Sequence, residues 1–261
     1  MREISNALKR RLEDLTVPNH LAVIPDGNRR WAAELGLSVM EGHRAGFEVA
    51  KSLSRFCRRI GIHTLTIWAF STENWKRDAA QVSALMALYE DWLTELLAEA
   101  IEEEVRVIHL GRLEGLPKGA TGPAAAAGFP EGLPISLQQG LIDIENKTAG
   151  HERNVINLAI NYGGEDEVSR AVGKLIRDSN LREGNHDGLD LANFLDTAGQ
   201  LHPNPDVVWR TSGEMRSSGF LPLQSAYAEL VFSPKFFPAL TEEDVLEMVA
   251  EYSARIRRFG G

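Results

Sequence analysis

The chain has 261 residues, of which 43% are hydrophobic and 25% are charged, and its formal net charge is −9 with a pI near 5.4. This acidic balance argues against the basic surface that nucleic-acid binding requires, so no nucleic-acid partner is expected. The single cysteine, Cys57, excludes an intrachain disulfide and fits the reducing conditions of the cytoplasm.

The first predicted element is a charged amphipathic helix within residues 1–18, which lacks the apolar segment of a signal peptide. Short runs rich in β-branched and aromatic residues predict buried strands at residues 20–25, 63–70, 105–111, 154–164, 206–211 and 228–234. Apolar residues at helical spacing predict helices at residues 43–61, 81–104, 137–148, 165–176 and 241–259. The Gly-, Pro- and Ala-rich residues 115–134 are expected to form a loop insertion.

Strands and helices alternate along the chain, which is typical of the α/β class with a mostly parallel central sheet flanked by helices. We find no internal repeat and no domain boundary, so residues 1–261 are expected to form a single domain. No stretch reaches the roughly 18 apolar residues of a transmembrane helix, and a cytoplasmic location is expected. Ligands of parallel sheets bind beyond the carboxyl ends of strands, which points to the turns after the first, second and fifth strands.

The turn after the first strand is polar and contains Asp26, Gly27, Asn28, Arg29, Arg30 and Trp31. Its carboxylate is a candidate metal ligand, and backbone N–H groups entering a helix are a natural phosphate cradle. The arginines add phosphate-binding charge, and His43 adds a further donor. The alternative is an aspartate that caps the helix beside solvated arginines.

The turn after the second strand combines hydroxyl, carboxylate, amide, indole and guanidinium groups in Ser71, Thr72, Glu73, Asn74, Trp75, Lys76 and Arg77. A plain turn seldom needs so much chemistry. The alternative is a Ser/Thr helix cap, with Trp75 packed on the core.

The third turn, after the fifth strand, contains Arg210, Arg216, Ser217 and Ser218, and this set of arginines and hydroxyls predicts an anion clamp. Glu229 follows beside a predicted strand, where a carboxylate is costly unless it is paired or metal-bound. Taken alone, Glu229 is better interpreted as forming a salt bridge to one of these arginines. No Walker A motif and no paired acidic cluster occur, so these turns favour a diphosphate enzyme with sparse metal ligation over a nucleotide hydrolase.

These segments resemble the motifs of the cis-prenyltransferase family, which includes the undecaprenyl diphosphate synthases. The matching segments are HLAVIPDGNRRWA, GHRAG, TIWAFSTENWKR, NLAINYGG and DVVWRTSGEMRSSGFLPLQSAYAELVF, and the likeness runs from His20 to the final RRFGG. The resemblance implies a hydrophobic tunnel, a homodimer, Mg²⁺, and the substrates isopentenyl diphosphate and an allylic diphosphate. It also implies peripheral membrane contact through the product.

The resemblance assigns roles by position. Asp26 becomes the catalytic and metal-binding carboxylate, with Glu229 as a second metal ligand, often at the dimer edge. The residues assigned to binding the allylic diphosphate are Gly27, Asn28, Arg29, Arg30 and His43. Those assigned to binding isopentenyl diphosphate are Arg210, Arg216 and Ser218. Ser71 and Asn74 lie near the condensing carbons, and Trp75 and Arg77 lie on a loop that closes over substrate. Trp31, Thr72, Glu73 and Ser217 complete the predicted substrate site.

The chain departs from the family pattern at several positions near the predicted substrates. Val39 stands where an arginine is usual, Met215 replaces a histidine, and Leu223 replaces a tryptophan. These changes keep open a head-to-middle, lavandulyl-type condensation of short allylic diphosphates. A noncatalytic partner subunit is disfavoured because the Asp-Gly-Asn turn is intact, and a generic diphosphate-binding module is disfavoured by the apolar helix at residues 82–97. Product length and preferred starter are not readable from the sequence.

Overall fold

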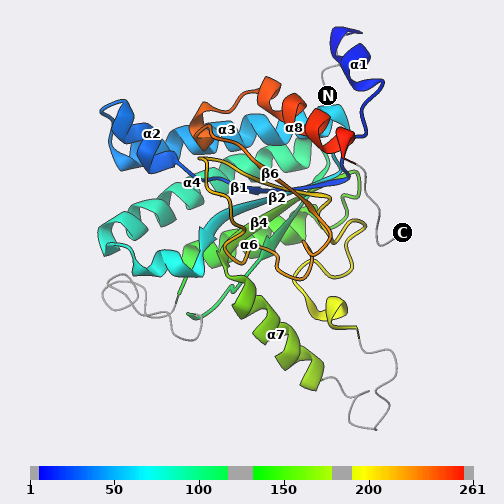
Figure 1. The fold of residues 1–261 in the computed structure, drawn as a ribbon. Coiled ribbons are helices and arrows are strands. Elements are labelled where there is room, and N and C mark those ends of the chain that lie inside the picture. The colour runs from blue at the N-terminus through cyan, green and yellow to red at the C-terminus, as the bar shows by residue number, and fades with distance from the viewer. Residues whose placement is uncertain (1–5, 117–131, 178–189, 256–261) are drawn as a thin grey trace.

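The computed structural model describes residues 6–116, 132–177 and 190–255 (Figure 1). It contains a six-stranded sheet in the order β3-β4-β2-β1-β5-β6, and each pairing of neighbouring strands is parallel. The strands are β1 (His20–Ile24), β2 (Thr64–Ser71), β3 (Val105–Leu110), β4 (Asn154–Tyr162), β5 (Val207–Arg210) and β6 (Glu229–Phe232). The predicted α/β class is therefore confirmed.

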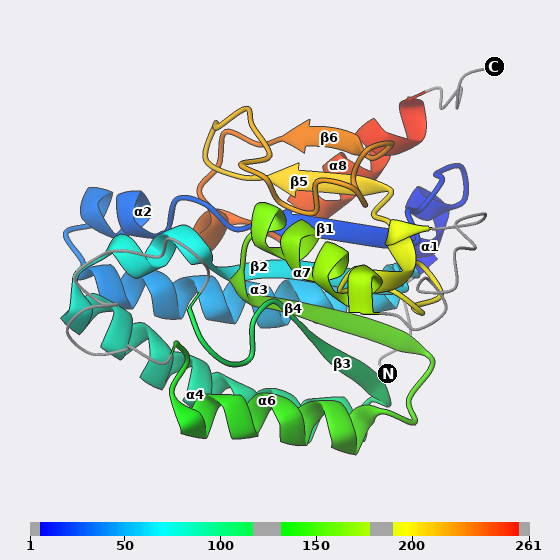
Figure 2. The ribbon, with the colours of Figure 1, turned by 90° about the horizontal axis from the view of Figure 1, so that it is seen from below.

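Helices cover both faces of the sheet, but unequally (Figure 2). The α-helices are α1 (Asn6–Leu12), α2 (Asn28–Glu34), α3 (Val39–Ile60), α4 (Ala79–Glu102), α6 (Ile135–Thr148), α7 (Gly164–Arg177) and α8 (Glu242–Ala254). Short 3₁₀ helices are η1 (Thr72–Lys76), η3 (Leu191–Phe194) and η4 (Phe237–Ala239). α3, α4, α6 and α8 pack on one face, whereas α7 and the segments around β5 and β6 cover the other. Within the described residues, no helix combines the length and apolarity needed to cross a membrane.

The core follows from strands that are buried on both faces. In β1, Leu21 and Val23 face α3 and α8, while Ala22 and Ile24 face the other layer, and all are nearly inaccessible. A parallel strand covered on both sides has no polar face, which is why β1 is an unbroken apolar run.

The boundaries of α3 are set by local chemistry at both ends. Ser38 and Glu41 form a capping box at its start, and Gly61 ends it in the left-handed conformation at φ 97°. The predicted end at Gly61 is thus confirmed, although the helix begins at Val39 rather than at residue 43.

Some sequence predictions need correction. The polar turn after β1 becomes helix α2 from Asn28 onward, because Gly27 turns the chain and its carbonyl accepts from the Trp31 N–H at 2.8 Å. The final helix, α8, ends at Ala254. Most of the predicted insertion at residues 115–134 and the first five residues lie outside the described part of the chain.

Two irregularities in the sheet lie near the site. The pairing of β2 with β4 shifts register twice. Ala69 of β2 and Asn161 of β4 are each skipped in the pairing, so each is an extra residue in its strand. A bulge re-aims the side chains that follow it. Here the shift turns Phe70 toward α4 and places both Trp68 and Ala69 beside the cavity described below.

Candidate active site

The turns after β1, β2 and β5 meet at one cavity of about 470 Å³ at the carboxyl edge of the sheet. Its lining is polar at the mouth and apolar inside. The predicted site residues that line it are Asp26, Asn28, His43, Ser71, Glu73, Asn74, Arg77, Arg210 and Ser218. Parallel strands bring these turns together because their carboxyl ends share one edge.

Asp26 lies between two guanidinium groups at the centre of the mouth. Its carboxylate accepts hydrogen bonds from Arg210 at 2.9 Å and from Arg30 at 3.2 Å. The backbone of Asp26 is fixed as well, since the Thr211 hydroxyl contacts both its N–H, at 2.9 Å, and its carbonyl, at 2.7 Å. The side chain remains 30% exposed, so the carboxylate is held in place yet accessible to a ligand.

Glycines bring the first turn close to its neighbours. Gly27 has φ 102°, and a Cβ there would lie 2.6 Å from the Phe236 ring. A Cβ on Gly42 would lie 2.3 Å from the backbone carbonyl oxygen of Asn28, and one on Gly46 would lie 2.8 Å from its side-chain oxygen. The GHRAG segment therefore lets α3 pack directly on the start of α2.

An outer recess of about 540 Å³ adjoins the cavity and carries positive charge. Besides Asp26, Asn28, His43 and Arg77, its lining includes Gly27, Arg29, Arg30 and Val39. Buried Oδ1 of Asn28 and Nε2 of His43 have no hydrogen-bond partner among the described residues. Unpaired buried polar atoms are costly. The His43 nitrogen can donate to an anion, so together with the arginines it makes the recess suited to an anionic ligand, whereas the Asn28 oxygen, an acceptor, would need a donor or a cation.

The charges around His43 and Arg77 reinforce this interpretation. Burial, followed by the nearby Arg77 and Arg29, lowers the pKa of His43 from 6.5 to about 4. Burial also lowers the pKa of Arg77, to which Arg29 contributes by repulsion. Both pKa values are lowered because the protonated, cationic form is unfavourable at these positions. A bound anion would stabilise that form.

The second turn forms the short helix η1 and has two sides. Ser71 and Asn74 form a capping box, in which the Ser71 N–H donates to the Asn74 side chain at 3.1 Å, and both residues line the cavity. Trp75 points the other way, is fully buried, and donates its indole N–H to Asn161 at 2.8 Å. Trp75 thus packs in the core, as the alternative interpretation of this turn has it, and its place on a loop that closes over substrate stays a prediction.

Arg210 connects the first and third turns. Its buried guanidinium donates to the Asp26 carboxylate, to the Arg216 carbonyl at 2.7 Å and to the Ser218 hydroxyl at 2.8 Å. The Arg216 side chain is instead 61% exposed and pairs with Glu214, which also contacts Arg30. The third turn thus offers one fixed guanidinium inside the cavity and one exposed guanidinium at its rim.

Glu229 does not lie with Asp26 in this chain. It begins β6 and pairs in register with Val207, three residues before Arg210, so it sits about 10 Å from the carboxyl edge along the strand. Its carboxylate forms an ion pair with Arg255 at 2.8 Å. The metal role of Glu229 stays a prediction, and its salt bridge is to Arg255 rather than to one of the arginines of the third turn.

Other predicted residues line neither the cavity nor the recess: Trp31, Thr72, Trp75, Arg216 and Ser217. Conversely, the apolar interior is lined by residues that the sequence had not singled out, namely Phe47, Ala50, Ile67, Tyr89 and Trp92. Helical spacing carried a signal for some of them. His43, Phe47 and Ala50 lie at i, i+4 and i+7, so one polar lining residue on α3 identifies its apolar neighbours.

The donors present fit a magnesium ion shared with phosphate. Mg²⁺ is usually held by one or two carboxylates together with substrate phosphates and water. Asp26 supplies an accessible carboxylate beside the anion-binding recess, and no group of three His, Cys, Asp or Glu side chains among the described residues forms a closed metal cage. The protein alone thus offers a partial site that a diphosphate would complete.

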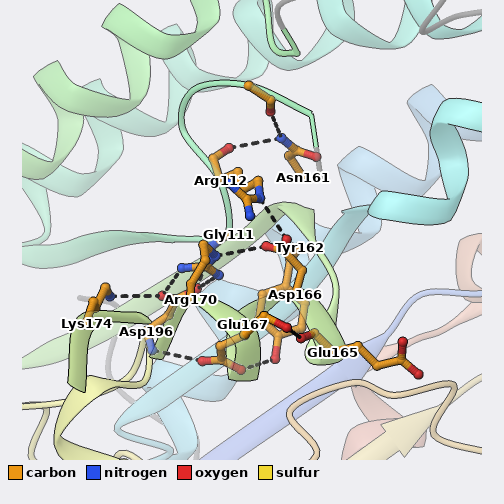
Figure 3. A network of polar contacts seen from close by, with 12 residues as sticks. Gly111, Arg112, Asn161, Tyr162, Glu165, Asp166, Glu167, Arg170, Lys174 and Asp196 are labelled. Atoms are coloured by element: carbon orange, nitrogen blue, oxygen red, sulfur yellow. Dashed lines mark hydrogen bonds and ion pairs between the residues drawn. The ribbon is translucent and has the colours of Figure 1, made fainter. Parts of the chain in front are cut away.

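A polar network that includes Tyr162, Glu167 and Asp196 lies between β4, α7 and the segment before β5 (Figure 3). The fully buried Glu167 carboxylate accepts hydrogen bonds from Tyr162, from Gln224 at 2.8 Å, and from the Asp196 N–H at 2.8 Å. Burial raises the pKa of Glu167 above its usual value. Because Gln224 ends the segment that carries Ser218, this network holds the third turn against β4 and α7.

Comparisons with known proteins give consistent matches. Residues 24–127 and 123–260 match the family described as "Putative undecaprenyl diphosphate synthase". An isoprenyl transferase of Thermus thermophilus is 39% identical over 254 residues, covering 94% of this chain and 89% of that protein. An isoprenyl transferase of Heliobacterium mobile is 36% identical over 258 residues, covering 98% and 92%.

Two solved structures share the fold. Lavandulyl diphosphate synthase from Lavandula x intermedia, in complex with dimethylallyl diphosphate, gives a TM-score of 0.82 at 31% identity, covering 94% of this chain and 99% of that one. A "probable undecaprenyl diphosphate synthase" of Campylobacter jejuni gives a TM-score of 0.71 at 27% identity, covering 95% and 100%.

Proposed function

The chain belongs to the undecaprenyl diphosphate synthase family and is a cis-prenyltransferase, and from this premise we propose that its cavity joins isopentenyl diphosphate to an allylic diphosphate with the help of Mg²⁺. One observation carries the assignment of the site. Asp26, Arg77 and Arg210 come from three different turns and line one cavity whose interior is apolar. Such a cavity suits a substrate with a charged head and a hydrocarbon tail.

In the proposed reaction, the carbon–oxygen bond of the allylic diphosphate breaks, and the diphosphate leaves with the electron pair. The double bond of isopentenyl diphosphate forms the new bond to the allylic carbon, and a proton then passes from the adjacent carbon to an oxygen of the released diphosphate. Arg29, Arg77 and His43 bind the leaving diphosphate, which places positive charge where negative charge develops. When bound, Mg²⁺ supplies further counter-charge there, and Asp26 is the residue that holds it.

The second substrate is assigned to the third turn. Arg210 and Ser218 line the cavity beside Asp26, with Arg216 within reach at the rim, and together they would bind the diphosphate of isopentenyl diphosphate. Ser71 and Asn74 line the same cavity from the second turn. They would orient the reacting carbons and the departing proton.

A homodimer is proposed on the exposed edge of the sheet. Among the described residues, β6 has a neighbouring strand only on the β5 side, and large apolar side chains nearby are exposed, including Tyr227 at 77% and Leu230 at 40%. An unprotected edge strand is a ready site for association. The metal role of Glu229, which begins β6, would depend on this assembly.

We also propose a single domain, because both matched segments contribute strands to one sheet. We propose a cytoplasmic location because the one cysteine is buried and free.

A head-to-middle condensation of two short allylic diphosphates is a second candidate. Val39 lines the recess and gives it an apolar wall, and the lavandulyl diphosphate synthase structure matches with the higher of the two TM-scores reported above. This reaction would use the same Asp26 and Arg210 but place a second allylic diphosphate in the third-turn site.

The test is an incubation with labelled isopentenyl diphosphate and allylic starters of increasing length, with and without Mg²⁺. We expect product only with Mg²⁺ and isopentenyl diphosphate, and none from Asp26→Ala despite an unchanged circular dichroism spectrum. Product from dimethylallyl diphosphate alone would favour the head-to-middle reaction. Normal turnover by the folded Asp26→Ala variant would reject the role assigned to the carboxylate.

A further inference from the structure

We propose that a cationic groove along α7 is a second entrance to the cavity, through which isopentenyl diphosphate reaches its site while the allylic diphosphate stays bound. This inference rests on the proposed function, because it names the route taken by one of the two substrates. The groove has a volume of about 850 Å³ and is lined by η1, by α7 and by Ser218 and Gly219 of the third turn.

The groove adjoins the half of the cavity that is assigned to isopentenyl diphosphate. Ser218 and Glu73 line both the cavity and the groove, so these two side chains stand between them. The outer recess adjoins the other half, because it shares Asp26, His43 and Arg77 with the cavity. In the described part of the chain, the cavity thus has one opening beside each proposed diphosphate site.

One face of α7 lines the groove along the whole helix. Asp166, Arg170 and Lys174 lie four residues apart in one row, and a second row with the same spacing runs from Glu165 to Arg177. Residues four apart lie above one another on a helix, so the two rows form one continuous face. At 1.5 Å per residue, α7 makes this wall of the groove about 20 Å long.

Two glycines bring the second and third turns together at the inner end of the groove. A Cβ on Gly163 would collide with the Thr72 hydroxyl, and one on Gly164 would collide with the Gly219 carbonyl oxygen. Thr72 belongs to the second turn and Gly219 to the third, so both turns touch the start of α7. A diphosphate that follows the groove inward therefore arrives between these two turns.

The charge of the groove favours an anion. Among the described residues, five cationic and three anionic side chains line it, although the chain as a whole carries a net charge of −9. Arg112 and Arg170 donate to Asp166 at 2.7 and 2.9 Å, which fixes them in the wall (Figure 3). Lys174 and Arg177 are exposed and lie nearer the end of the helix. Excess positive charge in a concave surface attracts anions from solution.

A separate entrance lets the second substrate arrive while the first is in place. In the proposed function, Arg29, Arg77 and His43 bind the allylic diphosphate, and all three line the recess. The bound allylic substrate therefore closes the recess, and its tail occupies the apolar interior. The groove stays open beside Ser218. Each isopentenyl diphosphate would then enter without release of the growing chain.

The experiment measures how fast isopentenyl diphosphate associates with the full chain, by stopped-flow quenching of tryptophan fluorescence, since Trp68 lines the cavity. The protein is first loaded with Mg²⁺ and an allylic thiodiphosphate, whose carbon–sulfur bond breaks too slowly for condensation. In Lys174→Glu/Arg177→Glu, the association rate constant should fall by roughly three- to tenfold at low ionic strength, because steering charges act mainly on association. The difference should shrink as salt is added. Association of the allylic thiodiphosphate with the unloaded chain should be unchanged.

Two further variants separate the groove from net charge. Lys9→Glu/Lys147→Glu is the matched control, because it changes the net charge by the same amount at exposed positions on α1 and α6. Neither position lines the cavity, the recess or the groove, so isopentenyl diphosphate should associate at the native rate. Ser169→Trp narrows the groove from the exposed surface of α7 without changing the charge, and it should slow association.

The inference is overturned if Lys174→Glu/Arg177→Glu takes up isopentenyl diphosphate at the native rate, or if the loaded allylic thiodiphosphate itself blocks uptake. Failure of the proposed function has a different signature, in which the native chain forms no product from the two reactive substrates. The groove is then tested with inorganic pyrophosphate alone, whose association the α7 double variant should slow and the matched control should not. Equal rates in these two variants would overturn the groove as a path for diphosphates.

Discussion

Arg210 is the side chain on which the site geometry depends most, and its replacement gives a graded prediction. The buried guanidinium makes three hydrogen bonds, to the Asp26 carboxylate, the Arg216 carbonyl and the Ser218 hydroxyl. Arg210→Ala removes the guanidinium assigned to isopentenyl diphosphate, and truncating one partner of a desolvated, hydrogen-bonded charge pair typically costs about 2–5 kcal/mol of binding free energy. At about 1.4 kcal/mol per tenfold change, kcat/KM for isopentenyl diphosphate should fall by roughly thirty- to several-thousand-fold.

Arg210→Lys keeps the charge but not the planar fork. An ammonium group is a single point of charge, so at least one charge-assisted hydrogen bond, worth about 1.5–3 kcal/mol, is lost. The expected fall in kcat/KM is therefore roughly ten- to a hundred-fold. Arg55→Ala is the control, because Arg55 is 58% exposed in an ion pair with Glu99 on the helix surface and such pairs contribute about 1 kcal/mol or less.

Steady-state kinetics with both diphosphates varied, and circular dichroism to verify the fold, complete this test. The reasoning is refuted if folded Arg210→Ala stays within tenfold of the native kcat/KM. Equal losses in the lysine and alanine variants would show that charge, and not the fork geometry, is what the site needs.

Two further predictions concern stability. Gly27→Ala places a Cβ 2.6 Å from the Phe236 ring at φ 102° and should lower the free energy of unfolding by about 1–3 kcal/mol. Gly36 also has a positive φ, 67°, but has open space around it, so Gly36→Ala should lower stability less, as measured by thermal melts. An equal loss of stability in the two variants would rule out the clash with Phe236. Burial lowers the pKa of His43 from 6.5 to about 4, so the unfolded chain binds a proton in that window that the folded chain does not. The contribution of His43 to stability should be complete above pH 6.5 and fall as pH drops toward 4, by up to about 1.4 kcal/mol per pH unit. His43→Gln should reduce the total slope in urea unfolding by that amount, leaving the parts due to His20, His63 and His109, whose pKa values burial also lowers; an unchanged slope would contradict the assignment.

Much of the fold could be predicted because local signals agreed with one another. The strands β1, β4 and β5 are buried along their whole length, as in a sheet covered on both faces, and the alternation of strands with helices requires parallel connections. Gly61 ended α3 where a left-handed residue was needed. The three polar turns could be placed at one edge for the same reason, since parallel strands end on the same side.

The direction of individual side chains could not be predicted in this way. Trp75 and Ser71 belong to one turn, but Trp75 is drawn into the core by Asn161 while Ser71 faces the cavity. Arg210 and Arg216 are six residues apart, but only Arg210 is buried beside Asp26. Both side-chain directions depend on contacts with residues that are distant in the sequence. The composition of a turn alone therefore does not predict which of its side chains faces the cavity.

The amino-acid sequence by itself determined the α/β class, the edge of the sheet that carries the site and the kinds of group assembled there. The tertiary structure decided that Glu229 lies at the opposite end of its strand from the site and that aromatic side chains of α3 and α4 line the cavity. The physical reason is that local sequence fixes which conformations and functional groups are available. Depth, register and burial are set only when segments far apart in the chain pack against one another.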